Sequence, residues 1–217
     1  MSKIEKGKFY VLDGVGAAGK TTQAPLACEY LRSLGREVVL TREPGGVAPA
    51  ETIRELIFLL KGKDAINPDH QVALFFAARY FWKKGVVVPN LYKGIDVLTD
   101  RYASATKAYR GYAEGADTDA IDKMVDAIMG EDKPDGIILL DVNARTAIER
   151  NQKDKTKRGE DPFDTQELEY FEKVIQGYRE MAEENWDNIP WYFVDGEQSI
   201  DKVAEDVRVA LDLIIGR

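Results

Sequence analysis

Short, continuous runs of hydrophobic residues recur along the chain and alternate with longer amphipathic segments. Such runs are typical of strands in a parallel sheet, because helices cover both faces of that sheet. They predict five strands, at residues 9–13, 37–41, 95–100, 135–142 and 190–195.

The segments between these runs carry hydrophobic residues at helical spacing. They predict helices at residues 19–35, 48–60, 67–84, 118–130, 144–152, 165–186 and 199–216. Asn67 followed by Pro68 is typical of a helix N-cap with proline in the first turn. The alternation predicts an α/β fold with helices on both faces of the sheet. No segment resembles an interdomain linker, so we expect residues 1–217 to form a single domain.

One segment, residues 153–164, interrupts this alternation. Its sequence, KDKTKRGEDPFD, is highly charged and has few apolar residues, although it lies between two predicted helices. Loops of this length are uncommon in compact domains and are often functional. Two interpretations stay open at this point: a solvated loop, or a mobile lid.

Composition and charge exclude several classes of function. The net charge of −8 argues against a surface that binds nucleic acid. The single cysteine, Cys28, and the single histidine, His70, exclude an intrachain disulfide framework and a Cys- or His-rich metal site. We expect Cys28 in the core and His70 at a helix start or on the surface. The first residues lack the apolar region of a signal peptide, and no stretch is long enough to span a membrane, so we expect a cytoplasmic protein.

Residues 13–23, DGVGAAGKTTQ, join the first predicted strand to the first predicted helix and satisfy two glycine patterns at once. The spacing of Gly14, Gly16 and Gly19 fits the dinucleotide-binding pattern, which also needs an acidic residue at the end of the second strand. That strand ends at residues 40–42, and the nearest carboxylate, Glu43, lies too far along. Lys20 and Thr21 instead complete GxxxxGK(S/T), so the sequence predicts a P-loop.

The chemistry of a P-loop defines the expected ligands. Its backbone N–H groups bind the β-phosphate, Lys20 reaches the β- and γ-phosphate oxygens, and Thr21 binds Mg²⁺. We therefore expect ATP and Mg²⁺ as cofactors. The residues expected to bind ATP are Gly14, Val15, Gly16, Ala17, Ala18, Gly19, Lys20, Thr21 and Thr22. A GTPase is not favoured, because NQKD at 151–154 only approximates the guanine-binding Asn-Lys-x-Asp and follows a helix.

Five further motifs occur in an order that resembles the thymidylate kinase family, from about residue 8 to the C-terminus. They are TREPGG (41–46), a hallmark of bacterial-type members, LFFAAR (74–79), TDRYASATKAYRGY (99–112), LLDV (139–142) and FEKVIQGYREMA (171–182). The resemblance implies a P-loop nucleoside-monophosphate-kinase fold, with a five-stranded parallel sheet, a short lid at about 153–164 and a homodimer. It implies ATP-dependent phosphorylation of thymidine monophosphate (dTMP) to the diphosphate (dTDP), a step in dTTP biosynthesis.

The resemblance also assigns residues to the base of the acceptor. It implies that Phe75 stacks on the base, that Arg79 donates to the base O4, and that Thr106 reaches the base edge. Arg110 stands where many bacterial members have a glutamine on the base. Two other interpretations stay open: Phe75 as a core residue, and Arg79 as a surface ion-pair partner.

A second group of residues is assigned by the resemblance to phosphoryl transfer. Arg101 is expected to bind the monophosphate, because an arginine fork suits phosphate oxygens. Asp100 is expected to orient the acceptor or a metal-bound water, with a strand-end cap as its alternative. Arg54 and Glu43 are expected on the acceptor side. Lys20, Arg101 and Asp100 are thus candidate catalytic residues.

The family places its catalytic arginine in the P-loop or in the lid. The P-loop has Ala17 at that place, so we expect the lid to supply the cation. Arg158 is the candidate catalytic residue, with Lys155 and Lys157 as helpers, and surface charge is the alternative role.

Four positions depart from the family's pattern. Gly16 replaces a P-loop acid that approaches the 3′-hydroxyl or a nearby metal, and Arg110 replaces the glutamine. Phe81 replaces a polar residue, and Pro162 stands where the lid's arginine is usual. Two alternatives to a dTMP kinase therefore stay open: a related kinase with another pyrimidine acceptor, and a non-catalytic nucleotide-binding relative.

Overall fold

The computed structural model describes residues 5–60, 67–158 and 168–217, with side chains described for all of these except 153–158. Five strands form one parallel sheet in the order β2-β3-β1-β4-β5. The strands are β1 (Phe9–Asp13), β2 (Val38–Arg42), β3 (Asp96–Asp100), β4 (Gly136–Asp141) and β5 (Trp191–Asp195). Each of the five predicted strands is confirmed, with its ends within one residue of the prediction.

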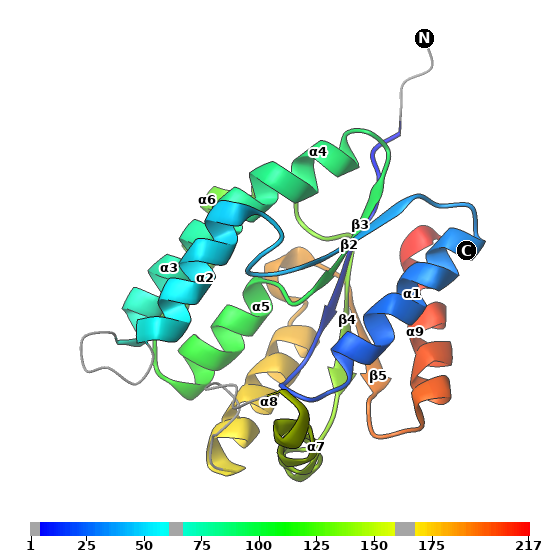
Figure 1. Ribbon diagram of the computed structural model, residues 1–217. Helices are drawn as coiled ribbons and strands as arrows, with labels where there is room; N and C mark the ends of the chain where they lie inside the picture. Colours follow the sequence, from blue (N-terminus) through cyan, green and yellow to red (C-terminus); the bar gives the residue numbers. More distant parts are fainter. Residues whose placement is uncertain (1–4, 61–66, 159–167) are drawn as a thin grey trace.

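Helices pack on both sides of the sheet (Figure 1). The helix α1 (Lys20–Ser33) lies beside α9 (Ile200–Ile215) on one side. The other α-helices are α2 (Ala48–Leu60), α3 (Pro68–Trp82), α4 (Val88–Leu91), α5 (Ala103–Thr106), α6 (Thr118–Met129), α7 (Ala144–Arg158) and α8 (Leu168–Glu183). Two π-helices, η1 (Lys83–Val87) and η2 (Lys107–Ala113), and a short 3₁₀-helix, η3 (Trp186–Asn188), complete the described elements. The predicted α/β fold is confirmed.

Some helix predictions were wrong in extent, and the helix expected over residues 165–186 already ends as α8 at Glu183. The helix expected over residues 67–84 ends as α3 at Trp82, and the chain continues as the π-helix η1. The helix expected over residues 144–152 runs on to Arg158, so its backbone takes up half of the charged segment expected to be a loop or lid. Residues 159–164 of that segment lie outside the described residues.

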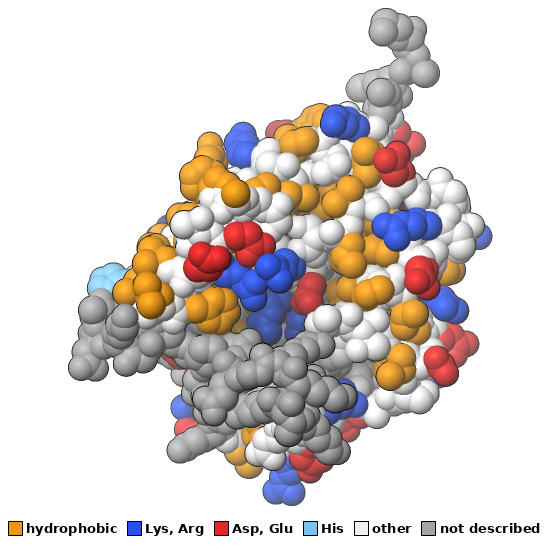
Figure 2. All heavy atoms as spheres, in the orientation of Figure 1, with side chains coloured by type: hydrophobic (Ala, Val, Ile, Leu, Met, Phe, Trp, Pro, Cys, Tyr) orange, Lys and Arg blue, Asp and Glu red, His pale blue; other side chains and the backbone are white. Residues whose placement is uncertain are grey.

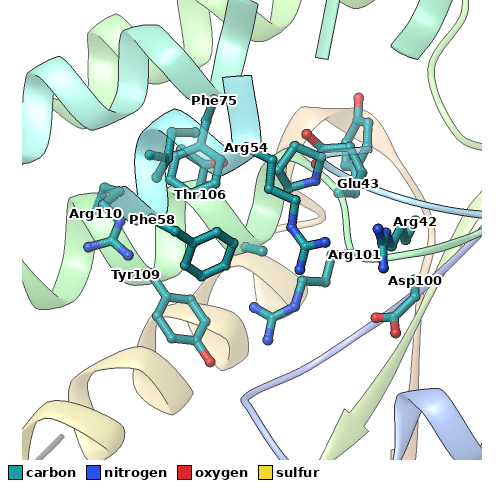
Figure 3. A pocket seen from close by; sticks show the side chains of 14 residues that line it. Arg42, Glu43, Arg54, Phe58, Phe75, Asp100, Arg101, Thr106, Tyr109 and Arg110 are labelled. Atoms are coloured by element: carbon teal, nitrogen blue, oxygen red, sulfur yellow. The ribbon is translucent and has the colours of Figure 1, made fainter. Parts of the chain in front are cut away.

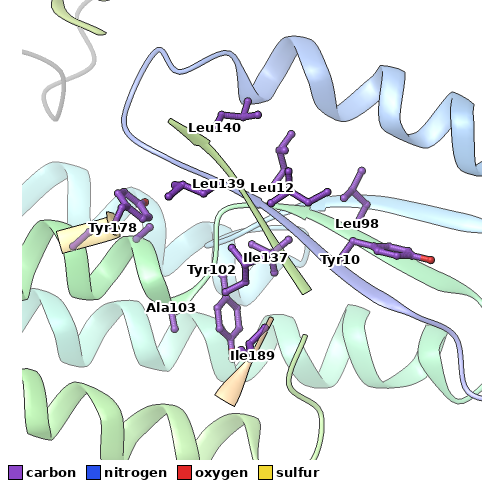
Figure 4. Close-up of a cluster of buried hydrophobic side chains, with 14 of the residues drawn as sticks. Tyr10, Leu12, Leu98, Tyr102, Ala103, Ile137, Leu139, Leu140, Tyr178 and Ile189 are labelled. Carbon is purple, nitrogen blue, oxygen red and sulfur yellow. The ribbon is translucent and has the colours of Figure 1, made fainter. Parts of the chain in front are cut away.

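The core forms where the central strands meet the flanking helices (Figure 4). Leu12, Leu98 and Ile137 are fully buried on neighbouring strands, as their positions in continuous hydrophobic runs predict. Cys28 is buried in α1, as expected. His70 is exposed in the first turn of α3, where its backbone N–H donates to the Asn67 side chain in a capping box. No helix in the described part of the chain is long and apolar enough to cross a membrane.

The parallel strands bring distant parts of the sequence to one edge of the sheet. The register aligns Leu12 with Asp100 and Arg42 with Asp100, so the residues that follow β1, β2 and β3 are neighbours. The connection that follows β1 leads to β2 on one side of β1, whereas the connection that follows β3 leads to β4 on its other side. Ligands of open α/β sheets bind at such a switch point.

Candidate active site

The P-loop connects β1 to α1 and has an unusual backbone conformation. Gly14 has a φ of 137°, and a Cβ there would lie 2.5 Å from the Leu140 carbonyl oxygen, so the turn requires glycine. Gly19 has a φ of 107°, and the non-glycine Ala17 has a φ of 60°. The start of a helix presents backbone N–H groups to an anion, so the start of α1 is a candidate phosphate site.

Lys20 lies inside this loop as the motif predicts. Its side chain is buried, and its Nζ donates to the carbonyl oxygens of Gly14 (2.8 Å) and Val15 (2.9 Å). Thr21, the next residue, is exposed at the start of α1. The predicted phosphate-binding residues are therefore contiguous at the helix start.

Asp13, at the end of β1, anchors the base of the loop and was not predicted. Its carboxylate accepts hydrogen bonds from the Gly14 backbone N–H (2.8 Å), the Tyr178 hydroxyl (2.7 Å) and the Ser104 hydroxyl (2.5 Å). Burial raises the pKa of Asp13 above its ordinary value of 3.8, although Lys20 and these hydrogen bonds act in the opposite direction. A carboxylate at the end of a buried run was the sequence signal that could have identified it.

Asp100 ends β3 beside the P-loop, and Arg101 follows it directly. The Arg101 N–H donates to the Leu12 carbonyl oxygen (3.0 Å), and its φ of 74° is uncommon for a non-glycine residue. Burial by itself lowers the pKa of Arg101, but Tyr109, Tyr178 and the nearby carboxylates raise it overall, so the guanidinium stays charged. The Asp100 Oδ1 atom is buried and has no hydrogen-bond partner among the described residues.

A cavity of about 160 Å³ opens in front of Arg101 (Figure 3). Among the residues expected to bind the acceptor, six line it: Glu43, Arg54, Phe75, Arg101, Thr106 and Arg110. Asp100 lines it as well. The structure thus brings together side chains from α2, α3, α5 and η2 and from the ends of two strands. The seventh expected residue, Arg79, is buried and does not line the cavity.

The cavity has a cationic end and an aromatic end. Arg42, Arg54 and Arg101 face the side near Asp100 (Figure 3), and Lys and Arg side chains gather there on the surface (Figure 2). Phe58, Phe75 and Tyr109 lie on the other side. Sequence reasoning missed Arg42, Phe58 and Tyr109, although Arg42 and Tyr109 lie within the quoted motifs. Guanidinium groups suit a phosphate and flat rings suit a base, so the polarity of the cavity matches a nucleotide.

Arg79 and Glu43 form a buried ion pair behind this cavity. The Arg79 Nη2 donates to Glu43 Oε2 (2.8 Å) and to the Thr106 hydroxyl (3.0 Å). Arg79 is fully buried, so its interpretation as a surface ion-pair partner was wrong. Burial raises the pKa of Glu43, while the charge of Arg79 acts to lower it. Glu43 Oε1, Arg79 Nε and Arg79 Nη1 are buried and have no hydrogen-bond partner among the described residues.

Arg110 is held at the same end from within η2. It forms an ion pair with Glu114, which also accepts from the Tyr170 hydroxyl (2.6 Å). Its guanidinium carbon lies 5.9 Å from the centre of the Phe75 ring. This contact sets a donor beside the ring expected to stack on the base.

The candidate metal site combines a hydroxyl and a carboxylate. Thr21 and Asp100 line the same open groove, which extends along the edge strand β2. Among the described residues, no group of three or more His, Cys, Asp or Glu side chains could hold a metal. The donors present fit Mg²⁺, which prefers oxygen ligands and is bound in such sites largely through substrate phosphates.

The connection from β5 to α9 packs against the P-loop. A Cβ on Gly196 would lie 3.3 Å from the Ala18 carbonyl oxygen, and the Gln23 side chain donates to the Ile200 carbonyl oxygen (2.9 Å). Arg150 on α7 donates to the Gly196 carbonyl oxygen (2.9 Å). Sequence reasoning had not singled out this part of the site.

The candidate lid residues are only partly described. Lys155, Lys157 and Arg158 belong to α7 by their backbone, but their side chains lie outside the description. Pro162 lies wholly outside the described residues.

Comparisons with known proteins agree on one family. The family model for thymidylate kinase matches residues 12–207. The chain is 33% identical to a thymidylate kinase from Teredinibacter turnerae, over 96% of this chain and 99% of that protein. It is 34% identical to one from Hahella chejuensis, over 92% of this chain and 93% of that protein. The crystal structure of thymidylate kinase from Ehrlichia chaffeensis is similar with a TM-score of 0.75 and 27% identity, covering 95% of this chain and 99% of that one.

Proposed function

The chain belongs to the thymidylate kinase family, and from this premise we propose that it transfers the γ-phosphoryl group of ATP to dTMP. An oxygen of the dTMP 5′-phosphate attacks the γ-phosphorus, the bond to the β-γ bridging oxygen breaks, and dTDP and ADP are formed. The observation that carries the proposal is the meeting of a P-loop and a cavity with a cationic and an aromatic end at Asp100 and Arg101.

The two ends of the cavity account for acceptor binding. Arg101 and Arg54 bind the monophosphate, and Phe75 packs on the pyrimidine ring. Thr106 and Arg110 lie beside that ring, and both line the cavity. Arg79 does not line the cavity, so it acts from behind through its bonds to Glu43 and Thr106, which do line it.

The reaction joins two polyanions, so catalysis rests on positioning and on neutralising charge. The N–H groups at the start of α1 and Lys20 bind the β- and γ-phosphates of ATP. Arg101 holds the attacking phosphate, and Asp100 orients it from the end of β3. Mg²⁺ bound near Thr21 supplies further positive charge to the phosphates when it is present.

A turnover assay with a panel of nucleoside monophosphates tests the proposed activity. We expect ATP-dependent ADP release with dTMP, and a kcat/KM for dTMP above those for dUMP, dCMP and the purine nucleotides. The control is Lys20→Ala, for which we expect kcat to fall by about 10²–10³-fold, the usual cost of removing a donor to developing charge. A clear preference for another acceptor, or no turnover with any, would contradict the proposal.

We assign the remaining cation of the reaction to the lid segment, with Arg158 as the main residue. The P-loop has Ala17 where an arginine could act, and Lys155, Lys157 and Arg158 are the cations closest along the chain to the C-terminal end of α7. We expect Arg158→Ala to lower kcat by about 10²-fold or more while leaving dTMP affinity nearly unchanged, because its charge acts on the transferring phosphoryl group. Single-turnover rates and equilibrium binding separate the two effects, and Lys202→Ala, at an exposed lysine on α9, serves as the control. Full activity of Arg158→Ala would exclude this assignment.

We also infer a homodimer formed through α2 and α3. Leu59 on α2 is 65% exposed, and Tyr80 and Phe81 on α3 are 48% and 44% exposed. Hydrophobic side chains gather on the side of the molecule where these helices lie (Figures 1 and 2).

A further inference from the structure

Tyr109 connects the acceptor cavity to the P-loop. It lies on η2, and its ring lines the cavity. Its hydroxyl accepts a hydrogen bond from the Gly16 backbone N–H (2.7 Å) across 93 residues of sequence. Both the bond and the side chain are buried, so the interaction is shielded from competing water.

The ring is held on two sides. Its centre lies 6.2 Å from that of Tyr170 in an edge-to-face contact, and the Arg101 guanidinium carbon lies 5.4 Å from its centre. A tyrosine side chain has only two rotatable bonds before its hydroxyl, so a ring fixed in this way holds the hydroxyl in place. A ligand phosphate that binds the Arg101 guanidinium therefore contacts a group that itself packs against the Tyr109 ring.

The P-loop needs such an anchor at Gly16. A glycine loses more conformational freedom on ordering than any other residue, and Gly16 has no side chain of its own to hold the loop. The next residue, Ala17, has a φ of 60°, a conformation that persists only where its surroundings hold it. Asp13 fixes the first turn of the loop at Gly14, and Tyr109 fixes it two residues later.

We propose that Tyr109 is a positioning residue that couples the two substrate sites: acceptor binding beside its ring restrains the Gly16 N–H and so orders the P-loop for ATP. This inference rests on the proposed function only in naming dTMP as the acceptor. Because Gly16 has no side chain, the loop is ordered at this position by Tyr109, a residue of the acceptor cavity.

Amide exchange measured by NMR on the full chain tests the link without requiring turnover. In the free protein, Tyr109→Phe keeps the ring and removes the hydroxyl that accepts the hydrogen bond from Gly16. We therefore expect the Gly16 N–H to exchange about tenfold faster than in wild type. Tyr170→Phe is the matched control, because its hydroxyl bonds Glu114 and not the loop. We expect it to leave Gly16 exchange unchanged.

Ligand binding tests the coupling. Saturating dTMP should slow Gly16 exchange in wild type and not in Tyr109→Phe. By calorimetry, dTMP should raise the affinity for a non-hydrolysable ATP analogue by about fivefold or more in wild type, and this ratio should approach one in Tyr109→Phe. The inference is overturned if Tyr109→Phe matches wild type in both measurements, if Tyr170→Phe changes them equally, or if bound dTMP leaves wild-type exchange unaltered. Failure of the proposed function would appear separately, as a wild-type protein that does not phosphorylate dTMP.

Discussion

Phe75 has two candidate roles: packing within the protein, and stacking on the base of the acceptor. It is half-buried at the aromatic end of the cavity, whereas the adjacent Phe76 is buried in the core. We expect Phe75→Ala to raise the KM for dTMP about tenfold, because stacking of a base on an aromatic ring contributes about 1–3 kcal/mol. Phe193→Ala, at an exposed phenylalanine on β5, is the control and should leave the KM unchanged. An unchanged KM in Phe75→Ala would mean that Phe75 is a packing residue and does not stack on the base.

Asp13 gives a pH-dependent prediction. Burial raises the pKa of its folded-state carboxyl above 3.8, so the folded protein binds this proton more readily than the unfolded chain does. The contribution of Asp13 to the free energy of unfolding therefore falls as pH rises from about 3.8 through the folded pKa, and is lowest above that pKa.

The comparison of wild type with Asp13→Asn isolates this effect, since asparagine does not titrate. Urea unfolding at several pH values between about 4 and 7 measures the difference. We expect wild type to gain stability relative to Asp13→Asn as pH is lowered through this window. The opposite slope would mean that Lys20 and the three hydrogen bonds outweigh burial.

At this scale, the sequence predicts residues whose chemistry a local motif defines. Lys20 and Thr21 follow from spacing alone, and Asp100 and Arg101 from a motif at a strand end. Tyr109 and Asp13 were missed because their roles depend on partners 93 and 165 residues away, Gly16 and Tyr178. Arg79 was identified, but its burial against Glu43 depends on how α3 packs over the residues that follow β2.

Among the elements, η2 and α8 approach so closely that a glycine is needed between them. A Cβ on Gly177 would lie 2.6 Å from Cγ of Tyr112, an atom of a ring rather than the end of a flexible chain. We expect Gly177→Ala to lower the free energy of unfolding by about 1–3 kcal/mol, the usual cost of overpacking, despite the higher helix propensity of alanine. Urea denaturation measures this.

A double-mutant cycle supplies the control. If the clash with Tyr112 causes the loss, Tyr112→Ala should remove most of the penalty of Gly177→Ala. Equal effects of Gly177→Ala in both backgrounds would contradict a steric cause. The same contact matters for the site, because η2 carries Tyr109 and Arg110 and α8 carries Tyr178.

The elements that the sequence did not predict are the irregular ones. The five strands and the long helices follow from hydrophobic periodicity, but η1 and η2 widen the helical turn, and no periodicity of 3.6 residues describes them. η2 forms where Lys107, Tyr109 and Arg110 are all buried with polar or aromatic partners. Tertiary contacts therefore set its geometry, as is common for π-helices at functional sites.

At the scale of the whole molecule, the strand order places the functional residues together more than any single motif does. β1 lies between β3 and β4, so the P-loop that follows β1 lies next to Asp100 and Arg101. Periodicity predicted a parallel sheet but could not give its order, because the order depends on which helix covers which face. The departures at Gly16 and Arg110 likewise acquire partners only in the folded chain, Tyr109 and Glu114.

The inferred homodimer gives the last prediction. An exposed face that includes Leu59, Tyr80 and Phe81 is costly on a monomer, and a second copy related by a two-fold axis can cover the same face on both chains. We expect the protein to sediment at about twice its chain mass of 24.4 kDa. Leu59→Lys should weaken association by about tenfold or more, because it places a charge in a desolvated apolar contact. Leu213→Lys, at an exposed leucine on α9, should leave the dimer intact, and a wild-type monomer at micromolar concentration would refute the inference.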